Sequence, residues 1–270
     1  MNVPAEDKLA PTTERVLLRR DVNGVAWLTL SRPAERNALS TGLMAALDAE
    51  LVRIEADAAV KVVVIGGAGP AFCAGHDLRE LRATPTGPTC EATFALCSRL
   101  MLRVVRLPKP VIARVHGVAT AAGCQLVASC DLAVAADTAR FATPGVNIGL
   151  FCSTPMVALS RVVGRKAAME MLLTGDLVDA ARAREIGLVN RVVPEADLDA
   201  TISALADQIA GKSPLTVAIG KAAFYRQAEM ALDEAYDYAA EVMTRNMLTR
   251  DAAEGIDAFL AKRAPVWTGT

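Results

Sequence analysis

The chain has 270 residues, of which 53% are hydrophobic and 22% are charged, and its formal net charge is −1. This composition supports a sizeable core and excludes a wholly disordered chain, and we expect no nucleic-acid partner because there is no basic excess to neutralise phosphates. The six cysteines form no Cys-x-x-Cys pair and only two histidines are present, so we expect neither a metal site nor a permanently bound cofactor.

The first part of the chain predicts strands and helices in alternation. Residues 1–14 predict a flexible polar tail without the features of a signal or transit peptide, and residues 24–31 predict a strand after an Asn-Gly turn. Ser40 fits the N-cap of an amphipathic helix over 41–57, and the apolar run at 61–69 fits a buried strand.

The same alternation continues towards the middle of the chain. Residues 90–107 predict a helix that ends at two prolines, and residues 110–117 and 131–136 predict strands. Between these strands, a turn of small residues leads into a short apolar helix that contains Gln125. We therefore expect an α/β core over residues 15–195.

After Pro194 the pattern changes. Residues 195–227 and 230–263 predict helices without strands. We expect residues 196–270 to form a helical region that serves as an oligomer interface or a lid.

No apolar run is long enough to cross a bilayer, and the thiols suit a reducing compartment. We therefore expect a soluble cytoplasmic protein with no membrane partner.

Four ordered motifs carry a family resemblance. They are "RPAERNALS" at 32–40, "AFCAGHDLREL" at 71–81, "VHGVATAAGCQLVASCDLAVA" at 115–135 and "ARAREIGLVNRVVP" at 181–194. The chain resembles the enoyl-CoA hydratase/isomerase (crotonase) superfamily over nearly everything after its N-terminal tail. The resemblance implies a ClpP-like spiral of ββα turns, an acyl-CoA thioester as substrate or ligand, a place in acyl-CoA or fatty acid metabolism, and homotrimers that often pair into hexamers.

The two central motifs imply an oxyanion hole. A thioester that becomes an enolate develops negative charge on its oxygen, and two backbone N–H groups aimed at that oxygen stabilise it. By their place in the motifs, the donors are the N–H groups of His76 and Ala122. The alternative is that Ala121, Ala122 and Gly123 are small only to let a helix pack on a strand.

The chain differs from the family at the positions of the catalytic acids. Hydratases of this family use two glutamates, whose positions here are held by Gln125 and Gly145, and the acid of some isomerases corresponds approximately to Ser153. None of these residues can act as a general acid or base. With "FATPGVNIGLFCSTP" at 141–155 and "KRAPVW" at 262–267, the pattern is similar to one subgroup, the enoyl-CoA hydratase domain-containing protein 3 type, whose members share this replacement.

Several other side chains have more than one interpretation. His76 could exchange a proton, as in the similar "AGHD" motif of methylmalonyl-CoA decarboxylase, or could contribute only its backbone. Cys152 could be a nucleophile but is more typical of a small pocket-lining residue. Asp77 is better explained as an acceptor that fixes its loop, His116 as a structural histidine, and Gln125 as a group that holds water or ligand.

The resemblance also implies residues that contact the substrate or its coenzyme A. They come from the two loops, the central helix, the predicted acyl pocket and the helical end. In chain order they are Asn37, Ala38, Leu39, Ala74, His76, Asp77, Leu78, Gly123, Cys152, Lys221 and Phe224. Helical spacing alone would place Phe224 in the core.

Three functions stay open from the sequence. The chain could be an enoyl-CoA hydratase-like lyase or isomerase with weak or altered activity, a decarboxylase that uses the hole and His76, or a non-catalytic acyl-CoA binder. Acyl chain length, pathway and the choice between trimer and hexamer are not predicted.

Overall fold

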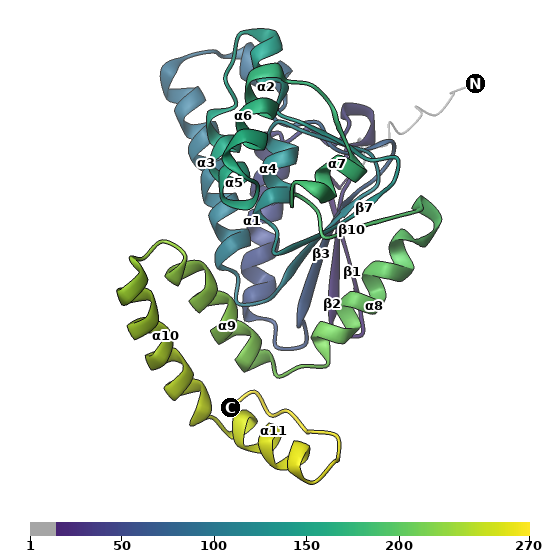
Figure 1. Cartoon of the computed structure of the whole chain (residues 1–270). Helices are drawn as coiled ribbons and strands as arrows, with labels where there is room; N and C mark the ends of the chain where they lie inside the picture. The colour runs from purple at the N-terminus through teal and green to yellow at the C-terminus, as the bar shows by residue number, and fades with distance from the viewer. Residues whose placement is uncertain (1–14) are drawn as a thin grey trace, which may run out of the picture.

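Two parallel-rich sheets form the centre of the molecule in the computed structural model, which describes residues 15–270 (Figure 1). The larger sheet has the strand order β1-β2-β3-β5-β7-β10, and the smaller has the order β4-β6-β8-β9. The first is built from β1 (Leu17–Val22), β2 (Val25–Leu30), β3 (Val62–Gly67), β5 (Val111–Val115), β7 (Leu132–Ala136) and β10 (Arg191–Val193), the second from β4 (Ala71–Cys73), β6 (Val118–Thr120), β8 (Arg140–Ala142) and β9 (Val178–Asp179). Among the strand pairs of residues 15–270, only β1–β2 and β8–β9 are antiparallel.

Helices follow successive pairs of strands and cover the sheets, which confirms the predicted α/β core. The first six are α1 (Thr41–Ala56), α2 (Leu78–Ala83), α3 (Gly87–Arg106), α4 (Ala122–Ser129), α5 (Ser153–Val162) and α6 (Arg165–Thr174), followed by α7 (Ala180–Glu185). Short 3-10 helices occupy Pro33–Glu35, Pro144–Ile148 and Glu195–Asp197. The predicted tail at 1–14 lies outside the described residues.

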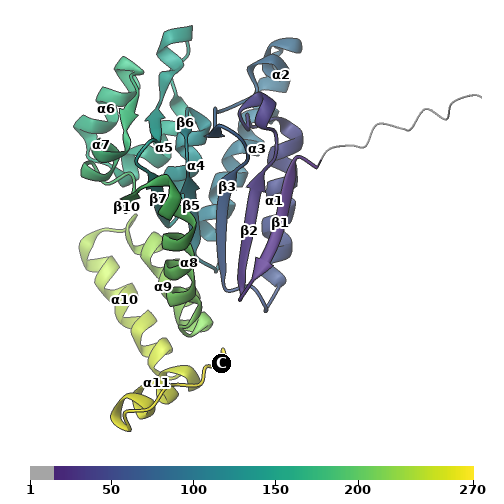
Figure 2. The same cartoon turned by 90° about the vertical axis from the view of Figure 1, so that its right-hand side faces the viewer.

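The C-terminal region is helical, as predicted, and consists of α8 (Leu198–Ala210), α9 (Pro214–Gln227), α10 (Leu232–Met247) and α11 (Arg250–Leu260). Figure 2 shows α8 against the large sheet, where Leu198, Ile202 and Ala206 pack on residues of β2, β3, β5 and β7. By contrast, α10 and α11 extend away from the sheets and pack mainly on α9. Among residues 15–270, no helix is both long and apolar enough to span a bilayer.

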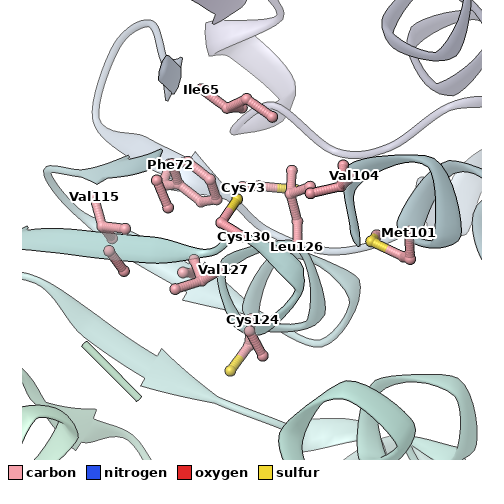
Figure 3. Packing of buried hydrophobic residues seen from close by; sticks show 14 of the residues in the cluster. Ile65, Phe72, Cys73, Met101, Val104, Val115, Cys124, Leu126, Val127 and Cys130 are labelled. Atoms are coloured by element: carbon pink, nitrogen blue, oxygen red, sulfur yellow. The ribbon is translucent and has the colours of Figure 1, made fainter. Parts of the chain in front are cut away.

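Buried thiols help to fill the main core, which the strands form together with α1, α3 and α4. Cys73, Cys124 and Cys130 lie among aliphatic side chains in Figure 3 and are at most 8% exposed. Burial raises the pKa of Cys73 and of Cys124 to about 12. These cysteines therefore act as small hydrophobic residues and are not thiolate nucleophiles.

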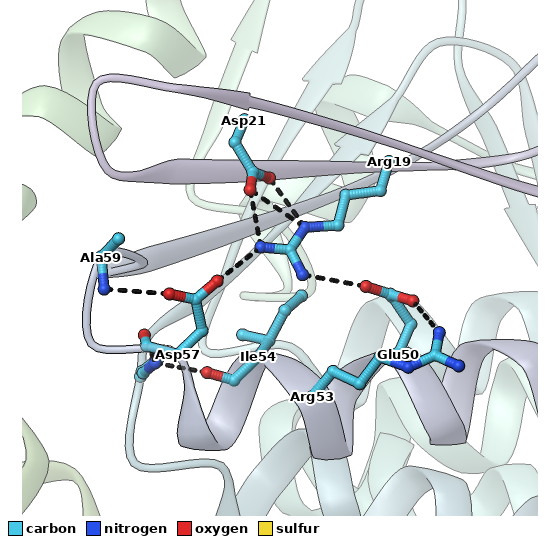
Figure 4. Close-up of polar contacts among 8 residues, drawn as sticks. Arg19, Asp21, Glu50, Arg53, Ile54, Asp57 and Ala59 are labelled. Carbon is cyan, nitrogen blue, oxygen red and sulfur yellow. Dashed lines mark hydrogen bonds and ion pairs between the residues drawn. The ribbon is translucent and has the colours of Figure 1, made fainter.

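A network centred on Arg19 holds the edge strand β1 to α1 (Figure 4). Its guanidinium contacts the carboxylates of Asp21, Glu50 and Asp57, at 2.9 Å for Glu50 and 2.8 Å for Asp57. Burial opposes the charge on Glu50, but the hydrogen bonds from Arg19 and Arg53 outweigh it and lower the pKa of this carboxyl. The network lies far along the sheet from the motifs discussed next and serves the fold.

Candidate oxyanion hole and acyl site

The loop that follows β4 directs the N–H of His76 away from the neighbouring first loop. Leu39 and His76 form a parallel bridge in which the Leu39 N–H donates to Gly75 O at 2.7 Å and the Asp77 N–H donates to Leu39 O at 3.2 Å. In such a bridge the N–H of the middle residue points to the opposite edge. Accordingly, the His76 N–H donates to no group within residues 15–270.

The opposite edge is the N-terminus of α4. A Cβ placed on Gly75 would lie 3.4 Å from the Ala122 nitrogen and 2.9 Å from the Ala121 Cβ. Ala122 is the first residue of α4, so its N–H has no partner within the helix, and it donates to no other described group. The two predicted donors thus lie in adjoining segments with free N–H groups, next to the positive end of a helix.

Backbone strain accompanies this arrangement. Ala121 has φ +50° and ψ −118°, a conformation that residues with a side chain rarely adopt. It is held from both sides, because its N–H donates to Ala142 O and its carbonyl accepts the Gln125 N–H. Gly75 has φ +98° and faces the Ala121 methyl. A side chain at position 75 is therefore excluded both by the backbone conformation and by the lack of space.

Gly123 brings α4 against β4. A Cβ on Gly123 would come within 2.1 Å of Cys73 O, which is far inside contact distance. The small residues therefore serve helix packing as well as the free donors, so the two explanations of this stretch are compatible. Direct contact of Gly123 with a ligand stays a prediction.

The first loop is fixed by the side chain of Asn37, which is fully buried. Its Nδ2 donates to Ala68 O and Ala71 O, both at 2.8 Å, and its Oδ1 accepts the Arg32 N–H. These bonds occupy the amide, and the Asn37 N–H donates to Arg32 O, so Asn37 holds the loop together, and its contact with coenzyme A stays a prediction.

The Arg32 side chain extends this framework. Its Nη1 donates to Ala38 O at 2.7 Å, and its Nη2 donates to Asp77 Oδ2 at 3.0 Å. Asp77 Oδ1 also caps α2 by accepting the N–H groups of Arg79 and Glu80. Burial raises the pKa of Asp77, but the bond from Arg32 and those from α2 outweigh it, so the pKa lies below its ordinary value. Asp77 is thus an ionised loop-fixing acceptor.

Neighbouring predicted residues share this framework. The Ala74 N–H donates to Arg36 O, and Ala74 O accepts the Thr120 hydroxyl. Leu39 is buried, whereas Leu78, the first residue of α2, is 51% exposed. A cavity of about 300 Å³ opens beside them between the first loop, α2 and α3, and is lined by Leu39, Asp77, Glu80, Leu81, Ala92 and Thr93 among others.

The side chains of His76 and Gln125 both face α3. The His76 ring meets the Phe94 ring edge-on, with centroids 5.4 Å apart, and its Nε2 is buried without a hydrogen-bond partner among residues 15–270. Burial lowers the pKa of His76, so its imidazole is uncharged at neutral pH. Gln125 is 4% exposed, its Oε1 lies 4.0 Å from Cys97 Sγ, and its Nε2 donates to no described group.

Backbone closes the position predicted for the second family acid. A Cβ on Gly145 would come within 2.4 Å of Leu150 O and 2.9 Å of Cys152 Sγ. Cys152 is 7% exposed, and burial raises the pKa of its thiol. Cys152 therefore packs against Gly145 as a protonated small side chain. Ser153, the approximate isomerase position, begins α5.

Lys221 and Phe224 lie on α9 in different surroundings. The Lys221 ammonium donates to Asp131 Oδ2 at 2.7 Å and to two backbone carbonyls, and its side chain is 7% exposed. Tyr225 donates to the other oxygen of Asp131 at 2.9 Å. Phe224 is 62% exposed, so the helical-spacing interpretation that placed it in the core is wrong. Their contact with coenzyme A stays a prediction.

Sequence reasoning missed two residues that shape the site, Arg32 and Phe94. Arg32 stands in the first motif and Asp77 in the second, so an arginine that joins the two loops could have been anticipated from the two motifs. Phe94 carried no signal beyond helical spacing. His116 Nε2 lies 2.8 Å from Gly69 O, which fits the structural role expected for it. No cluster of three potential metal ligands occurs within the described part of the chain.

Comparison with known proteins agrees with this geometry. Residues 20–270 match the sequence profile of the family described as enoyl-CoA hydratase/isomerase. The mitochondrial enoyl-CoA hydratase domain-containing protein 3 of Rattus norvegicus is 45% identical over 254 residues, which cover 94% of this chain and 85% of that protein.

Two solved structures are also similar. An enoyl-CoA hydratase of Mycobacterium smegmatis has 55% identity and a TM-score of 0.92, covering 94% of this chain and 99% of the other. Human enoyl coenzyme A hydratase domain-containing protein 3 has 47% identity and a TM-score of 0.90, covering 94% and 100%. The chain therefore belongs to the enoyl-CoA hydratase/isomerase (crotonase) family, and within it to the enoyl-CoA hydratase domain-containing protein 3 type.

Proposed function

We propose that this protein binds an acyl-CoA thioester and stabilises its enolate with the backbone N–H groups of His76 and Ala122. The observation that carries the proposal is the pairing of these two unbonded donors across Gly75, at the N-terminus of α4. Donors that are fixed before the reaction stabilise developing charge without reorganisation, and one such donor is typically worth about 10²–10³ in rate.

The proposal excludes the two-glutamate hydration that the family name suggests. Gln125 carries no ionisable proton, and Gly145 has no side chain and no room for one. Placed proton transfer contributes about 10²–10⁴ in rate. Hydration of a simple enoyl thioester should therefore be absent or orders of magnitude below that of a two-glutamate relative.

A second candidate reaction is decarboxylation of a thioester that bears a carboxylate on its α-carbon. It is favoured because the carboxylate that follows the hole in sequence, Asp77, is already engaged by Arg32. When the C–C bond to the carboxylate breaks, its electron pair forms the enolate and CO₂ leaves, so no base is needed. The enolate then takes a proton from solvent, because the imidazole of His76 is uncharged at neutral pH. Release of CO₂ from malonyl-CoA tests this candidate.

The main proposal is tested with acetoacetyl-CoA, whose enolate absorbs light. We expect the parent to raise the enolised fraction on binding and Ala122→Pro to abolish that rise, because proline lacks the N–H. Arg165→Pro is the matched control, since Arg165 is likewise the first residue of a helix and follows a residue with φ −61° and ψ 146°. Circular dichroism checks the fold of both variants. Equal enolisation by parent and Ala122→Pro contradicts the proposal, and binding without turnover of any thioester supports the non-catalytic alternative.

Assembly belongs to the same proposal. The outer helices carry exposed apolar side chains, including Leu232, Tyr236 and Phe259 at 71%, 71% and 81% exposure. We propose a homotrimer, or a hexamer formed from two trimers, in which these faces are covered by other copies. Light scattering that gives a monomer mass at micromolar concentration contradicts this assembly.

The compartment stays a prediction. The sequence favours the cytoplasm, whereas the name of the rat relative includes the word mitochondrial. Immunodetection in separated cell fractions distinguishes the two.

A further inference from the structure

One arginine side chain joins the two loops that meet beside the candidate hole. Arg32 Nη1 donates to Ala38 O at 2.7 Å, and Arg32 Nη2 donates to Asp77 Oδ2 at 3.0 Å. Ala38 belongs to the first loop, whereas Asp77 belongs to the loop that follows β4. A single guanidinium therefore links two segments that are far apart in sequence.

Both contacts lie one residue away from the bridge that orients the His76 N–H. Ala38 immediately precedes Leu39, and Asp77 immediately follows His76. Leu39 and His76 are the two residues that form the parallel bridge. Because successive Cα atoms are only about 3.8 Å apart, a shift of Ala38 or Asp77 would shift the bridge as well.

The backbone holds one end of this bridge less closely than the other. The Leu39 N–H donates to Gly75 O at 2.7 Å, whereas the Asp77 N–H reaches Leu39 O only at 3.2 Å, the upper end of the usual range. The ion pair between Arg32 and Asp77 joins the same two segments at this end. Charge-assisted hydrogen bonds are about twice as strong as neutral ones, so the guanidinium supports the bridge where the backbone holds it least.

The backbone of Arg32 is itself fixed. The Arg32 N–H donates to Asn37 Oδ1 at 2.9 Å, and Arg32 O accepts the Asn37 N–H at 2.8 Å. Asn37 is fully buried, and the side chain of Arg32 is 18% exposed. A side chain that starts from a fixed backbone and ends on two partners has little freedom to move, as a group that supports a site requires.

The charges around the guanidinium make an arginine suitable for this task. Arg32 is the only cation among residues 15–270 that pairs with the Asp77 carboxylate. A second carboxylate, that of Glu35, lies 4.0 Å from Arg32 Nε. Because the guanidinium is planar, its two terminal nitrogens contact Ala38 and Asp77 at a fixed separation, which the single nitrogen of a lysine cannot reproduce.

We infer that Arg32 is a positioning residue for the candidate oxyanion hole. Its guanidinium holds Ala38 and Asp77 at the spacing that keeps the His76 N–H directed at the thioester oxygen. In this role Arg32 acts through the bridge and needs no contact with the ligand. The inference rests on the proposed function, because the donor has to be positioned only if an enolate forms there.

The ratio of enolate to keto form in bound acetoacetyl-CoA tests the inference. The ratio is measured at saturation, where it does not depend on affinity, so it separates the geometry of the hole from contacts of the first loop with coenzyme A. We expect Arg32→Met to lower this ratio about tenfold. That is less than the 10²–10³ typical of a lost donor, because the His76 N–H is displaced but still present.

Conservative variants distinguish positioning from general stability. Arg32→Lys, which keeps the charge but not the planar group, should lower the ratio by about threefold. Asp77→Asn should lower it several-fold while still capping α2, because asparagine caps helices as well as aspartate does. The double variant Arg32→Met, Asp77→Asn should fall no further than Arg32→Met alone, since both changes remove the same link.

Arg103→Met is the matched control. Arg103 is also partly buried, and it joins α3 to α1 through an ion pair with Asp48. Its loss should lower stability without changing the ratio of enolate to keto form. Circular dichroism and thermal unfolding verify the fold of each variant.

The outcomes separate this inference from the proposed function. A folded Arg32→Met protein whose ratio stays within about twofold of the parent overturns the inference while the function stands. If Arg32→Met does not fold, Arg32→Lys and Asp77→Asn decide by the same criterion. An equal fall in Arg103→Met also overturns it, because the effect then follows from stability alone. If the parent itself does not raise the enolised fraction, the proposed function fails and this inference fails with it.

Discussion

Gly145 and Leu150 are packed so closely that a Cβ on Gly145 would lie 2.4 Å from the Leu150 carbonyl oxygen. The Leu150 N–H also donates to Gly145 O, so the segment folds back on itself at this point. The place predicted for the second family acid is thus filled by the chain's own backbone, and introducing a glutamate there requires the segment to move.

We therefore expect Gly145→Glu to lower the free energy of unfolding by about 1–3 kcal/mol, as overpacking does. The double variant Gln125→Glu, Gly145→Glu should not gain hydration, because its second carboxylate cannot reach its place. Urea unfolding and the loss of crotonyl-CoA absorbance measure the two effects. Gly220→Ala is the control: Gly220 has no neighbour within contact of a new Cβ, and alanine should stabilise α9 by about 0.5–1 kcal/mol. Rapid hydration by the double variant would show that the segment opens easily.

Gly123→Ala should be more damaging than its size suggests. The added methyl would meet Cys73 O at 2.1 Å, so α4 would have to move away from β4, and the Ala122 N–H would move with it. We expect a loss of at least about 3 kcal/mol in stability or failure to fold, at the upper end of overpacking effects. Thermal unfolding measures this, with Ala128→Gly as a change of the same size in the same helix. A Gly123→Ala protein as stable as the parent would contradict the close approach.

Lys221 should contribute more to the stability of the fold than to binding of the nucleotide of coenzyme A. Its ammonium is buried against Asp131, and removing one partner of a buried ion pair typically costs about 3–5 kcal/mol. We expect Lys221→Met to lose stability on that scale in urea, while the exposed Lys166→Met changes it by less than about 0.5 kcal/mol. The ratio of affinities for coenzyme A and its 3′-dephospho form should not change. A stable Lys221→Met protein that no longer distinguishes the two would instead support nucleotide binding.

The titration of His76 should contribute to the dependence of stability on pH. Burial lowers the pKa of His76 below 6.5 in the folded protein, so on acidification the unfolded chain takes up this proton first. The contribution of the uncharged His76 to the free energy of unfolding is complete above about pH 6.5. It is lost as the pH falls towards the pKa of His76 in the folded protein. Melting temperatures between about pH 7.5 and 5 should fall less steeply for His76→Phe than for the parent.

The imidazole signals of the two histidines provide a direct check by NMR. Phe94→Ala should raise the pKa of His76 towards its ordinary value, because solvent then reaches the ring that Phe94 covers. Phe224→Ala, which removes an exposed ring on α9, should leave it unchanged. An unchanged pKa in Phe94→Ala would show that Phe94 does not shield the imidazole.

Local features of the fold could be predicted because their causes are local. Ser40 accepts the Leu43 N–H at 3.1 Å, as an N-cap does, and the prolines at 108 and 110 follow the end of α3. The pairing of the two central loops was also within reach, because two ordered motifs pointed to one family and to one pair of donors.

Long-range contacts were not predictable from local pattern. Lys221 and Asp131 are 90 residues apart in sequence, and nothing near either residue indicates that they meet. The same holds for Gly145, since the sequence shows a missing acid but not the carbonyl that fills its place. Nothing in the sequence indicates that the ring of Phe94 meets His76.

The anchoring of α9 also has a consequence for how the chain opens on long timescales. Lys221, Tyr225 and Asp131 tie α9 to the core through buried bonds, whereas α10 and α11 rest mainly on α9. In a single copy, the amide protons of α10 should therefore exchange with solvent through small, independent opening events, and those of α9 only through larger ones. Exchange in α10 that slows with rising protein concentration would report the moment at which another copy covers it.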